Sequence, residues 1–164
     1  MITGGQRSGK SRFAEEMALQ LSDRPVYIAT AQVFDDEFRE RVRIHQARRG
    51  PQWTNHEETL WLSKIDVEGR TVLVDCVTLW ATNMFFANGE DAASALEKLK
   101  EEFDKMIKAN ATFIFVTNEI GLGGVSENAM QRHFTDLQGS INQYIAAKAD
   151  DVYLCISGLH LKIK

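Results

Sequence analysis

The sequence is poor in cysteine and proline, has no excess of basic residues and contains no long apolar run. Its 164 residues include two cysteines and two prolines, too few cysteines for a disulfide scaffold. Cys76 and Cys155 form neither a CxxC pair nor a cysteine–histidine zinc spacing, so we expect no structural zinc. Each cysteine lies in an apolar run, which predicts buried free thiols and a cytoplasmic location.

Charge and hydropathy argue against two further classes of protein. The chain has 19 lysines and arginines against 23 aspartates and glutamates, a formal net charge of −4. A general nucleic-acid-binding protein is usually basic, so no nucleic-acid partner is expected. No apolar stretch approaches the roughly 20 residues that span a bilayer, and no hydrophobic signal region opens the chain. Length and composition predict one globular domain over residues 1–164.

Short β-rich runs alternate with longer helical patterns. The runs are continuous in hydrophobicity, as in strands covered on both faces. They are residues 26–30, 71–76, 112–117 and 151–156, preceded by a very short first strand at 1–3. Helical patterns cover residues 10–22, about 35–49, about 90–109 and about 130–148. This order predicts an α/β fold with a mainly parallel sheet, and the residues after the Ser157-Gly158 turn should add an antiparallel edge strand.

The stretch "GGQRSGKS" at residues 4–11 is a full Walker A pattern. Its glycines let backbone N–H groups approach phosphate oxygens, and the helix that follows directs its positive end at the same anion. Lys10 supplies a charge for the β- and γ-phosphates and Ser11 a hydroxyl ligand for Mg²⁺. We expect the Lys10 ammonium to lie in solvent while the loop is empty. A glycine-rich turn without a ligand is the alternative, but the flanking strand and helix favour a phosphate-binding loop.

Two of the predicted strands end in polar residues. Asp75 follows the apolar residues of the run 71–76, at the carboxyl end of a strand, where doubly wound sheets bind ligands. Together with Ser11 it is expected to hold Mg²⁺ or the water shell of the ion. The run 112–117 leads into "NEIGLGG", so Asn118 and Glu119 should lie at the same edge of the sheet as the Walker A loop. This segment is either a flexible connection or an element on the substrate side.

A basic stretch, "FRERVRIHQARRG", covers residues 38–50. On a helix, Arg41, His45 and Arg49 share one face. The arginines would attract phosphates and keep the imidazole unprotonated, so that it can attack phosphorus. A solvated basic face or a nucleic-acid patch would have the same composition. Downstream, Trp53 is expected in the core, and Glu57 is a candidate acceptor for a guanine edge or a ribose.

These pieces together resemble one family, the bifunctional adenosylcobinamide kinases / adenosylcobinamide-phosphate guanylyltransferases of cobalamin nucleotide-loop assembly. The matching segments cover most of the chain in order. They are "ITGGQRSGKSRFAE", "YIATAQVFDDEFRERVRIHQARRGPQWTNHEE", "VLVDCVTLWATN", "VTNEIGLGGVSENAMQRHFTDLQGSINQYIAAKADDVYL" and "SGLHLKIK". The arginine–histidine helix followed by the tryptophan is far more particular to this family than the Walker A loop.

The resemblance implies two transfers with GTP or ATP, adenosylcobinamide and its phosphate as substrates. A nucleoside triphosphate first phosphorylates adenosylcobinamide. GTP then donates GMP to the family's histidine, which falls on His45, and the GMP passes to the new phosphate. The resemblance also implies a RecA-like P-loop NTPase fold, helices on both faces of the sheet, and a homotrimer with active sites between subunits. Besides a catalytic role for Lys10, the implied nucleotide contacts are Gly4, Gly5, Gln6, Arg7, Ser8, Gly9, Lys10, Ser11, Ala31, Gln32, Val33, Gln46, Ala47, Arg48, Arg49, Glu57 and Asp75.

Two other classes of function stay open. A plain P-loop small-molecule kinase would use His45 only to bind phosphate. A nucleotide-switched binding module of the RecA type would need a partner surface and some nucleic-acid basicity, against which the net charge of −4 argues. Only the bifunctional enzyme predicts that label from α-labelled GTP stays on the denatured protein.

Overall fold

The structure is a computed structural model that describes residues 1–32 and 49–164. Its strands are β1 (Ile2–Gly4), β2 (Val26–Ala29), β3 (Thr54–Glu57), β4 (Thr71–Asp75), β5 (Thr112–Val116), β6 (Tyr153–Ile156) and β7 (Leu159–Lys162). Its helices are α1 (Lys10–Leu21), α3 (Val77–Ala87), α4 (Ala92–Met106) and α5 (Ala129–Lys148), with 3-10 turns η1 (Leu62–Lys64) and η2 (Gly121–Gly123).

The described strands form one seven-stranded sheet in the order β3-β2-β4-β5-β1-β6-β7. All neighbours in the sheet are parallel except β6 and β7, which pair antiparallel with Ile156 opposite Leu159. The predicted antiparallel edge strand is therefore confirmed. Its turn residues, Ser157 and Gly158, have φ angles of 52° and 82°, as a tight two-residue hairpin turn requires. β5 lies between β1, which leads into the Walker A sequence, and β4, which ends in Asp75.

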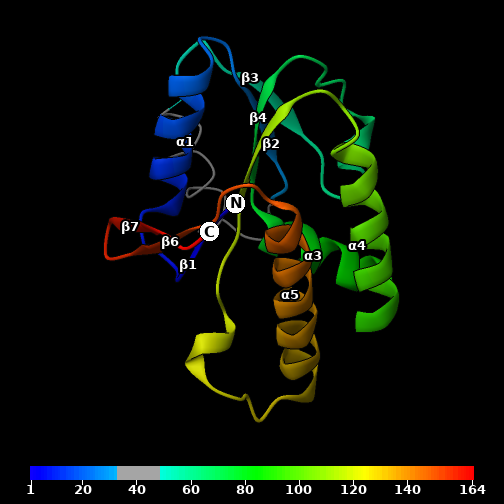
Figure 1. The fold of residues 1–164 in the computed structure, drawn as a ribbon. Coiled ribbons are helices and arrows are strands. Elements are labelled where there is room, and N and C mark those ends of the chain that lie inside the picture. The colour runs from blue at the N-terminus through cyan, green and yellow to red at the C-terminus, as the bar shows by residue number, and fades with distance from the viewer. Residues whose placement is uncertain (33–48) are drawn as a thin grey trace.

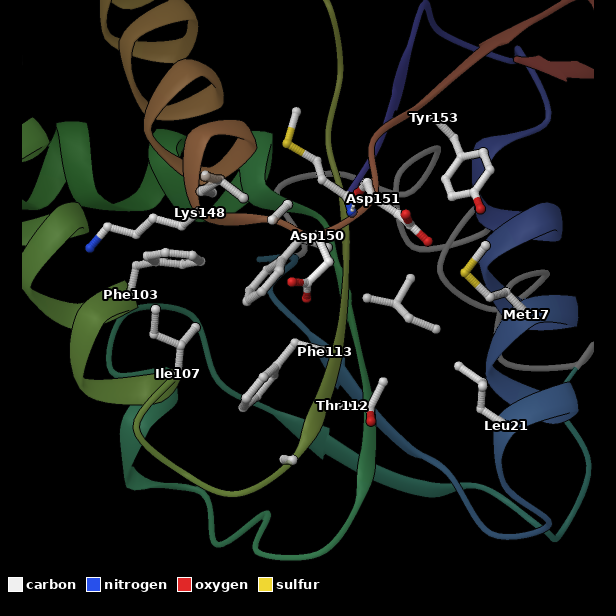
Figure 2. Close-up of a pocket in the computed structure, with 16 residues that line it drawn as sticks. Met17, Leu21, Phe103, Ile107, Thr112, Phe113, Lys148, Asp150, Asp151 and Tyr153 are labelled. Atoms are coloured by element: carbon white, nitrogen blue, oxygen red, sulfur yellow. Dashed lines mark hydrogen bonds between the residues drawn. The ribbon is translucent and has the colours of Figure 1, made fainter. Parts of the chain in front are cut away.

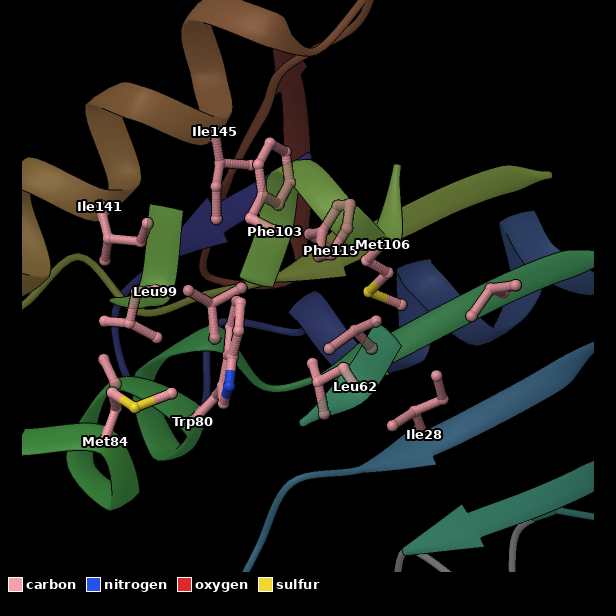
Figure 3. Packing of buried hydrophobic residues seen from close by; sticks show 14 of the residues in the cluster. Ile28, Leu62, Trp80, Met84, Leu99, Phe103, Met106, Phe115, Ile141 and Ile145 are labelled. Atoms are coloured by element: carbon pink, nitrogen blue, oxygen red, sulfur yellow. The ribbon is translucent and has the colours of Figure 1, made fainter. Parts of the chain in front are cut away.

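Helices cover both faces of the sheet, with α1 on one side and α3, α4 and α5 on the other (Figure 1). Strand β4 shows why its run is apolar throughout. Val72 and Val74 pack into the large core under α3, α4 and α5, whereas Leu73 between them packs into the smaller core under α1. Figure 3 shows the large core, with Trp80 and Leu99 at its centre. The predicted α/β fold with a mainly parallel sheet is confirmed.

Helix α4 follows the predicted helical spacing, since Ala95, Leu99, Phe103 and Met106 are buried. One helix and one strand, besides the two 3-10 turns, were not predicted from the sequence. Helix α3, "VTLWATNMFFA", is largely apolar because it packs against α4 and α5 and shares the large core with residues of the sheet. Strand β3, "TNHE", is polar and is held by parallel pairing with β2. Among the helices that the structure describes, none is long and apolar enough to cross a membrane.

Candidate functional site

The glycine-rich loop, residues 4–11, connects β1 to α1. Gly4 and Gly9 have φ angles of 150° and 98°. A Cβ on Gly4 would lie 2.3 Å from the carbonyl oxygen of Cys155, so a side chain has no room there. Ser8 N donates to Gly5 O at 3.3 Å and Phe13 N donates to Gly9 O at 3.1 Å. The loop thus has the strand-to-helix setting that the Walker A pattern requires.

Lys10 folds back onto this loop. The residue is 6% exposed, and its Nζ donates to Gly5 O at 2.6 Å and lies 3.5 Å from Ser8 Oγ. The expectation that the ammonium lies in solvent is wrong, because the loop supplies its own acceptors for the charge. Burial lowers the pKa of Lys10, while the nearby Cys76 and Asp75 side chains raise it. Lys10 and Asp75, which the sequence predicts as partners in one site, are therefore close enough to interact.

Asp75 meets a residue that the sequence analysis missed. Tyr27, on the neighbouring strand β2, donates its hydroxyl to Asp75 Oδ2 at 2.9 Å. Burial and the adjacent carboxylate raise the pKa of Tyr27 well above 10, so the phenol stays protonated and remains a donor. A tyrosine in the apolar run "VYIAT" is typical of a core residue, and no local pattern links it to an aspartate 48 positions later.

A cavity of about 230 Å³ lies beside Tyr27. It is lined by Tyr27, Ala29, Arg49, Asn55, His56 and Glu57. The Arg49 guanidinium carbon lies 3.5 Å from the centroid of the Tyr27 ring, and Arg49 Nε donates to Asn55 Oδ1 at 3.0 Å. Arg49 Nη1 is buried and has no hydrogen-bond partner among the described residues. A buried N–H without an acceptor is costly, so the cavity suits a ligand rich in oxygen atoms.

Tyr27 joins the two groups of predicted residues. Its hydroxyl contacts Asp75, and its ring face contacts Arg49. Trp53 packs against the same ring at 5.9 Å between centroids and is buried, so its predicted place in the core is confirmed. A series of neighbouring polar side chains therefore connects the glycine-rich loop, through Asp75 and Tyr27, with the cavity at β2 and β3.

The remaining predicted site residues fall into two groups. Gly5, Gln6, Arg7 and Gln32 are exposed and Ala31 is half-buried, with the first three in the glycine-rich loop and the others directly after β2. Val33, Arg41, His45, Gln46, Ala47 and Arg48 lie outside the described residues. Asn55 and His56 were not predicted to line a site. The only signal for them is their place beside Glu57 in a polar segment.

The predicted magnesium ligands fit an ion that is held jointly by protein and phosphate. Ser11 is half-buried at the second position of α1, and Asp75 is half-buried at the end of β4. No cluster of three or more histidine, cysteine, aspartate or glutamate side chains suited to a metal occurs in residues 1–32 and 49–164. Mg²⁺ is commonly bound by one or two protein oxygens together with substrate phosphates and water. One hydroxyl and one carboxylate near the glycine-rich loop match that donor set.

A larger cavity, of about 440 Å³, lies at the opposite end of the sheet and contains none of the predicted site residues. Figure 2 shows Phe103, Ile107 and Phe113 on one side of it and Met17 and Leu21 on the other. Thr112, the first residue of β5, also lines it, so this cavity lies at the amino ends of the strands. Open α/β sheets bind their ligands at the carboxyl ends. The candidate site is therefore the smaller cavity with the glycine-rich loop.

Comparison with known proteins gives consistent matches along the whole chain. The family model described as cobinamide kinase / cobinamide phosphate guanyltransferase matches residues 1–163. The chain is 38% identical over 182 residues to the bifunctional adenosylcobalamin biosynthesis protein CobU of Salmonella typhimurium, covering 100% of this chain and 98% of that protein. It is 38% identical over 179 residues to the protein of the same name from Escherichia coli, with the same coverage. It is 37% identical over 169 residues to the protein CobP of Pseudomonas aeruginosa, of which 96% is covered.

Proposed function

The chain belongs to the cobinamide kinase / cobinamide phosphate guanyltransferase family and is a kinase and guanylyltransferase, and we propose that both transfers use one nucleotide site at the carboxyl edge of its sheet. The observation that carries the proposal is the hydrogen bond from Tyr27 to Asp75 under the Arg49 guanidinium. It links the carboxylate near Lys10 to the cavity at β3. One bound nucleoside triphosphate could contact both.

In the first transfer, the glycine-rich loop holds the triphosphate of GTP or ATP through its backbone N–H groups. The Lys10 ammonium exchanges Gly5 O for the β- and γ-phosphate oxygens, which are stronger acceptors because they are charged. The hydroxyl oxygen of adenosylcobinamide bonds to the γ-phosphorus as the bond between that phosphorus and the β–γ bridging oxygen breaks. The nucleoside diphosphate leaves, and the hydroxyl proton is released.

Ser11 and Asp75 hold Mg²⁺ in this proposal. The ion, when bound, neutralises charge on the phosphates. Tyr27 fixes the orientation of the Asp75 carboxylate through Oδ2. Replacing a residue that hydrogen-bonds to a metal ligand and orients it commonly changes the affinity of the site for the metal.

In the second transfer, the nucleophile is His45. Its imidazole nitrogen bonds to the α-phosphorus of GTP as the bond between that phosphorus and the α–β bridging oxygen breaks, and pyrophosphate leaves with that oxygen. The GMP then passes to the phosphate of adenosylcobinamide phosphate and gives adenosylcobinamide-GDP, which frees the histidine. Arg49 follows His45 by four residues and lies over Tyr27, which supports a nucleophile beside this site. We include Gln46, Ala47, Arg48 and Glu57 among the GTP contacts, with Glu57 in the cavity next to Arg49.

We also propose a homotrimer in the cytoplasm. Apolar side chains of the C-terminal hairpin are exposed, which supports a subunit interface there. They are Ile156, Leu159, Leu161 and Ile163, at 60%, 76%, 63% and 57% exposure. Gly158 N in this hairpin donates to Ser8 O at 2.9 Å, so such an interface would adjoin the glycine-rich loop. Buried free thiols at Cys76 and Cys155, with burial raising the pKa of Cys76 to about 12, support a reducing compartment.

Retention of radiolabel on the denatured protein tests the covalent route. After incubation with Mg²⁺ and α-labelled GTP, the protein should keep the label, and with γ-labelled GTP it should not. A histidine–GMP bond is a phosphoramidate, so the label should survive mild base and be lost in mild acid. A plain kinase would retain no label from α-labelled GTP, and a serine or tyrosine ester would not show the acid lability.

A further inference from the structure

A buried polar network surrounds the carboxyl end of β5, and the roles described so far do not account for it. Thr117, Gln138 and Asn142 are 0%, 1% and 5% exposed. Thr117 Oγ1 donates to Asn142 Oδ1 at 2.7 Å, and Gln138 Nε2 donates to Thr117 Oγ1 at 2.9 Å and to Asn142 Oδ1 at 2.8 Å. Gln138 Oε1 has no partner among the described residues. Burying these three polar side chains costs desolvation free energy that apolar side chains would not cost. The network therefore contributes by holding the chain in one fixed arrangement.

The arrangement that it fixes is the backbone of Asn118. Asn118 O accepts from Asn142 Nδ2 at 3.0 Å, and Asn118 N donates to Thr78 Oγ1 at 2.9 Å. On either side, Thr117 N donates to Ile2 O and Glu119 N to Gly4 O, both at 3.0 Å. These two bonds continue the β5–β1 ladder up to the first residue of the glycine-rich loop. Both backbone groups of Asn118 are therefore held relative to that loop and to α3.

The continued ladder also sets the face on which the Asn118 side chain stands. Val116 packs in the core under α1, and Thr117 bonds to α5 on the opposite face. Because side chains alternate along an extended chain, Asn118 returns to the α1 face. Asp75 stands on that face too, since Leu73 two residues earlier packs under α1 and Tyr27 in the same core binds its carboxylate.

Asn118 consequently lies between the two halves of the predicted phosphate site. β5 separates β1, which leads into the glycine-rich loop, from β4, which ends in Asp75. Asn118 is half-buried, and its carboxamide forms no hydrogen bond within the part of the chain that the structure describes. A neutral N–H donor is thus available where the end of a triphosphate chain would lie.

We propose that Asn118 is a further catalytic residue of the kinase reaction, whose carboxamide N–H donates to a γ-phosphate oxygen of the bound triphosphate. The inference rests on the nucleotide site proposed above. In the kinase reaction the γ-phosphoryl group is transferred while its bond to the β–γ bridging oxygen breaks, and a fixed donor stabilises the charge spread over its oxygens. In the guanylyl reaction the bond between the α-phosphorus and the α–β bridging oxygen breaks, and the γ-phosphate leaves unchanged within pyrophosphate. Asn118 therefore affects the first reaction more than the second.

The test compares the two reactions in Asn118→Ala. Phosphorylation of adenosylcobinamide should lose about 100-fold in kcat, as is typical when one transition-state donor is removed. Formation of the GMP adduct from α-labelled GTP should stay within about threefold of the wild-type rate, because that reaction leaves the γ-phosphate intact. Asn110→Ala is the matched control, since Asn110 is exposed and precedes the amino end of the same strand. It should leave both reactions unchanged.

Thr78 separates a positioning role from a merely structural one. Thr78→Val removes the hydroxyl that accepts from Asn118 N and should lower phosphorylation by about tenfold with little effect on the adduct. Thr78→Ser keeps the hydroxyl and should recover most of the rate. If Thr78→Val and Thr78→Ser each lower phosphorylation and adduct formation by the same factor, the network acts on the fold alone and the positioning claim fails.

Unchanged phosphorylation in Asn118→Ala, or an equal loss in both reactions, would overturn the assignment to the γ-phosphate. Lys10→Ala distinguishes this failure from that of the nucleotide site itself. If Lys10→Ala loses both reactions while Asn118→Ala is normal, only the role of Asn118 is wrong. If Lys10→Ala is active, the nucleotide site is wrong and the role of Asn118 falls with it.

Discussion

The two ends of the sheet carry cavities of opposite character. The amino end has the larger cavity, about 440 Å³ against about 230 Å³. Its lining contains no buried polar side-chain atom that lacks a hydrogen-bond partner among the described residues. The lining of the smaller cavity contains such an atom, Arg49 Nη1. At the carboxyl end, Tyr27 and the residues around Asn118 also fix polar groups in place. We therefore propose the nucleotide site at the carboxyl end because of its unmet hydrogen bonding, although its cavity is the smaller one.

Replacing Lys10 should have the largest effect at the carboxyl end. Lys10→Ala removes the charge that holds the β- and γ-phosphates, a loss on the order of 3 kcal/mol, about a hundredfold, in both phosphorylation and adduct formation. Lys108→Ala, an exposed lysine after α4, is the control. Rates of both reactions at saturating adenosylcobinamide check the prediction, and near-normal turnover would exclude the glycine-rich loop as the phosphate site.

Replacing the proposed magnesium ligands should change the metal requirement. Ser11→Ala removes a hydroxyl ligand, and Asp75→Asn replaces a charged carboxylate with a neutral carboxamide that binds Mg²⁺ more weakly. Each should raise the Mg²⁺ concentration for half-maximal activity by about tenfold or more. Tyr27→Phe, which loses only the hydroxyl on Asp75, should shift it less and in the same direction. Titration of both reactions with Mg²⁺ measures this, with Asp136→Asn, on the exposed side of α5, as control. Unchanged metal dependence in both ligand variants would refute Asp75 as the metal carboxylate.

Arg49→Lys should weaken GTP binding without altering the fold. A lysine keeps the charge but lacks the planar guanidinium that stacks on Tyr27 and offers Nη1 to a ligand. The KM for GTP in adduct formation should rise about tenfold, as expected when one charge-assisted hydrogen bond is lost. Arg24→Lys, an exposed position before β2, should leave it unchanged. Equal KM values for the wild type and Arg49→Lys would remove Arg49 from the nucleotide site.

A substitution at the amino-end cavity should affect stability and spare activity. Phe113 lines that cavity and stacks on Phe115 at 5.8 Å between centroids. Phe113→Ala should lower the free energy of unfolding by about 1 to 2 kcal/mol, less than for a fully buried phenylalanine because Phe113 is half-buried. Denaturant unfolding measures the loss, while both reactions should keep wild-type rates below the unfolding transition. A selective loss of either activity would contradict the contrast between the two ends.

Patterns in the sequence were sufficient for elements whose burial is periodic or continuous. The run "TVLVDC" predicted β4 and "GLHLKIK" predicted the antiparallel edge strand, because their residues meet opposite faces or a tight turn in a regular way. Helix α3 lacks a polar face because it packs against other elements. Strand β3 lacks an apolar face because backbone pairing with β2, and not burial of its side chains, stabilises it. Neither condition is visible in the local sequence.

The candidate site likewise has parts that the local sequence predicts and parts that only the fold reveals. The glycine-rich loop could be predicted because all its chemistry is contiguous in the sequence. The contact between Tyr27 and Asp75 could not, since 48 positions separate the two residues. The burial of Lys10 depends on whether Gly5 O or solvent accepts from its ammonium, and spacing does not show which. The sequence predicted that Asn118 lies at this edge of the sheet. The hydrogen bonds that hold its backbone to Thr78 of α3 and Asn142 of α5 appear only in the fold.

The measurement that tests the central claim most directly is a paired assay of His45→Ala. The claim is that one nucleotide site serves two transfers, of which only the second needs a histidine. His45→Ala should form no covalent GMP adduct and no adenosylcobinamide-GDP, yet still phosphorylate adenosylcobinamide measurably, and His56→Ala should keep the adduct. An acid-labile GMP adduct that persists in His45→Ala would place the nucleophile elsewhere and contradict the account.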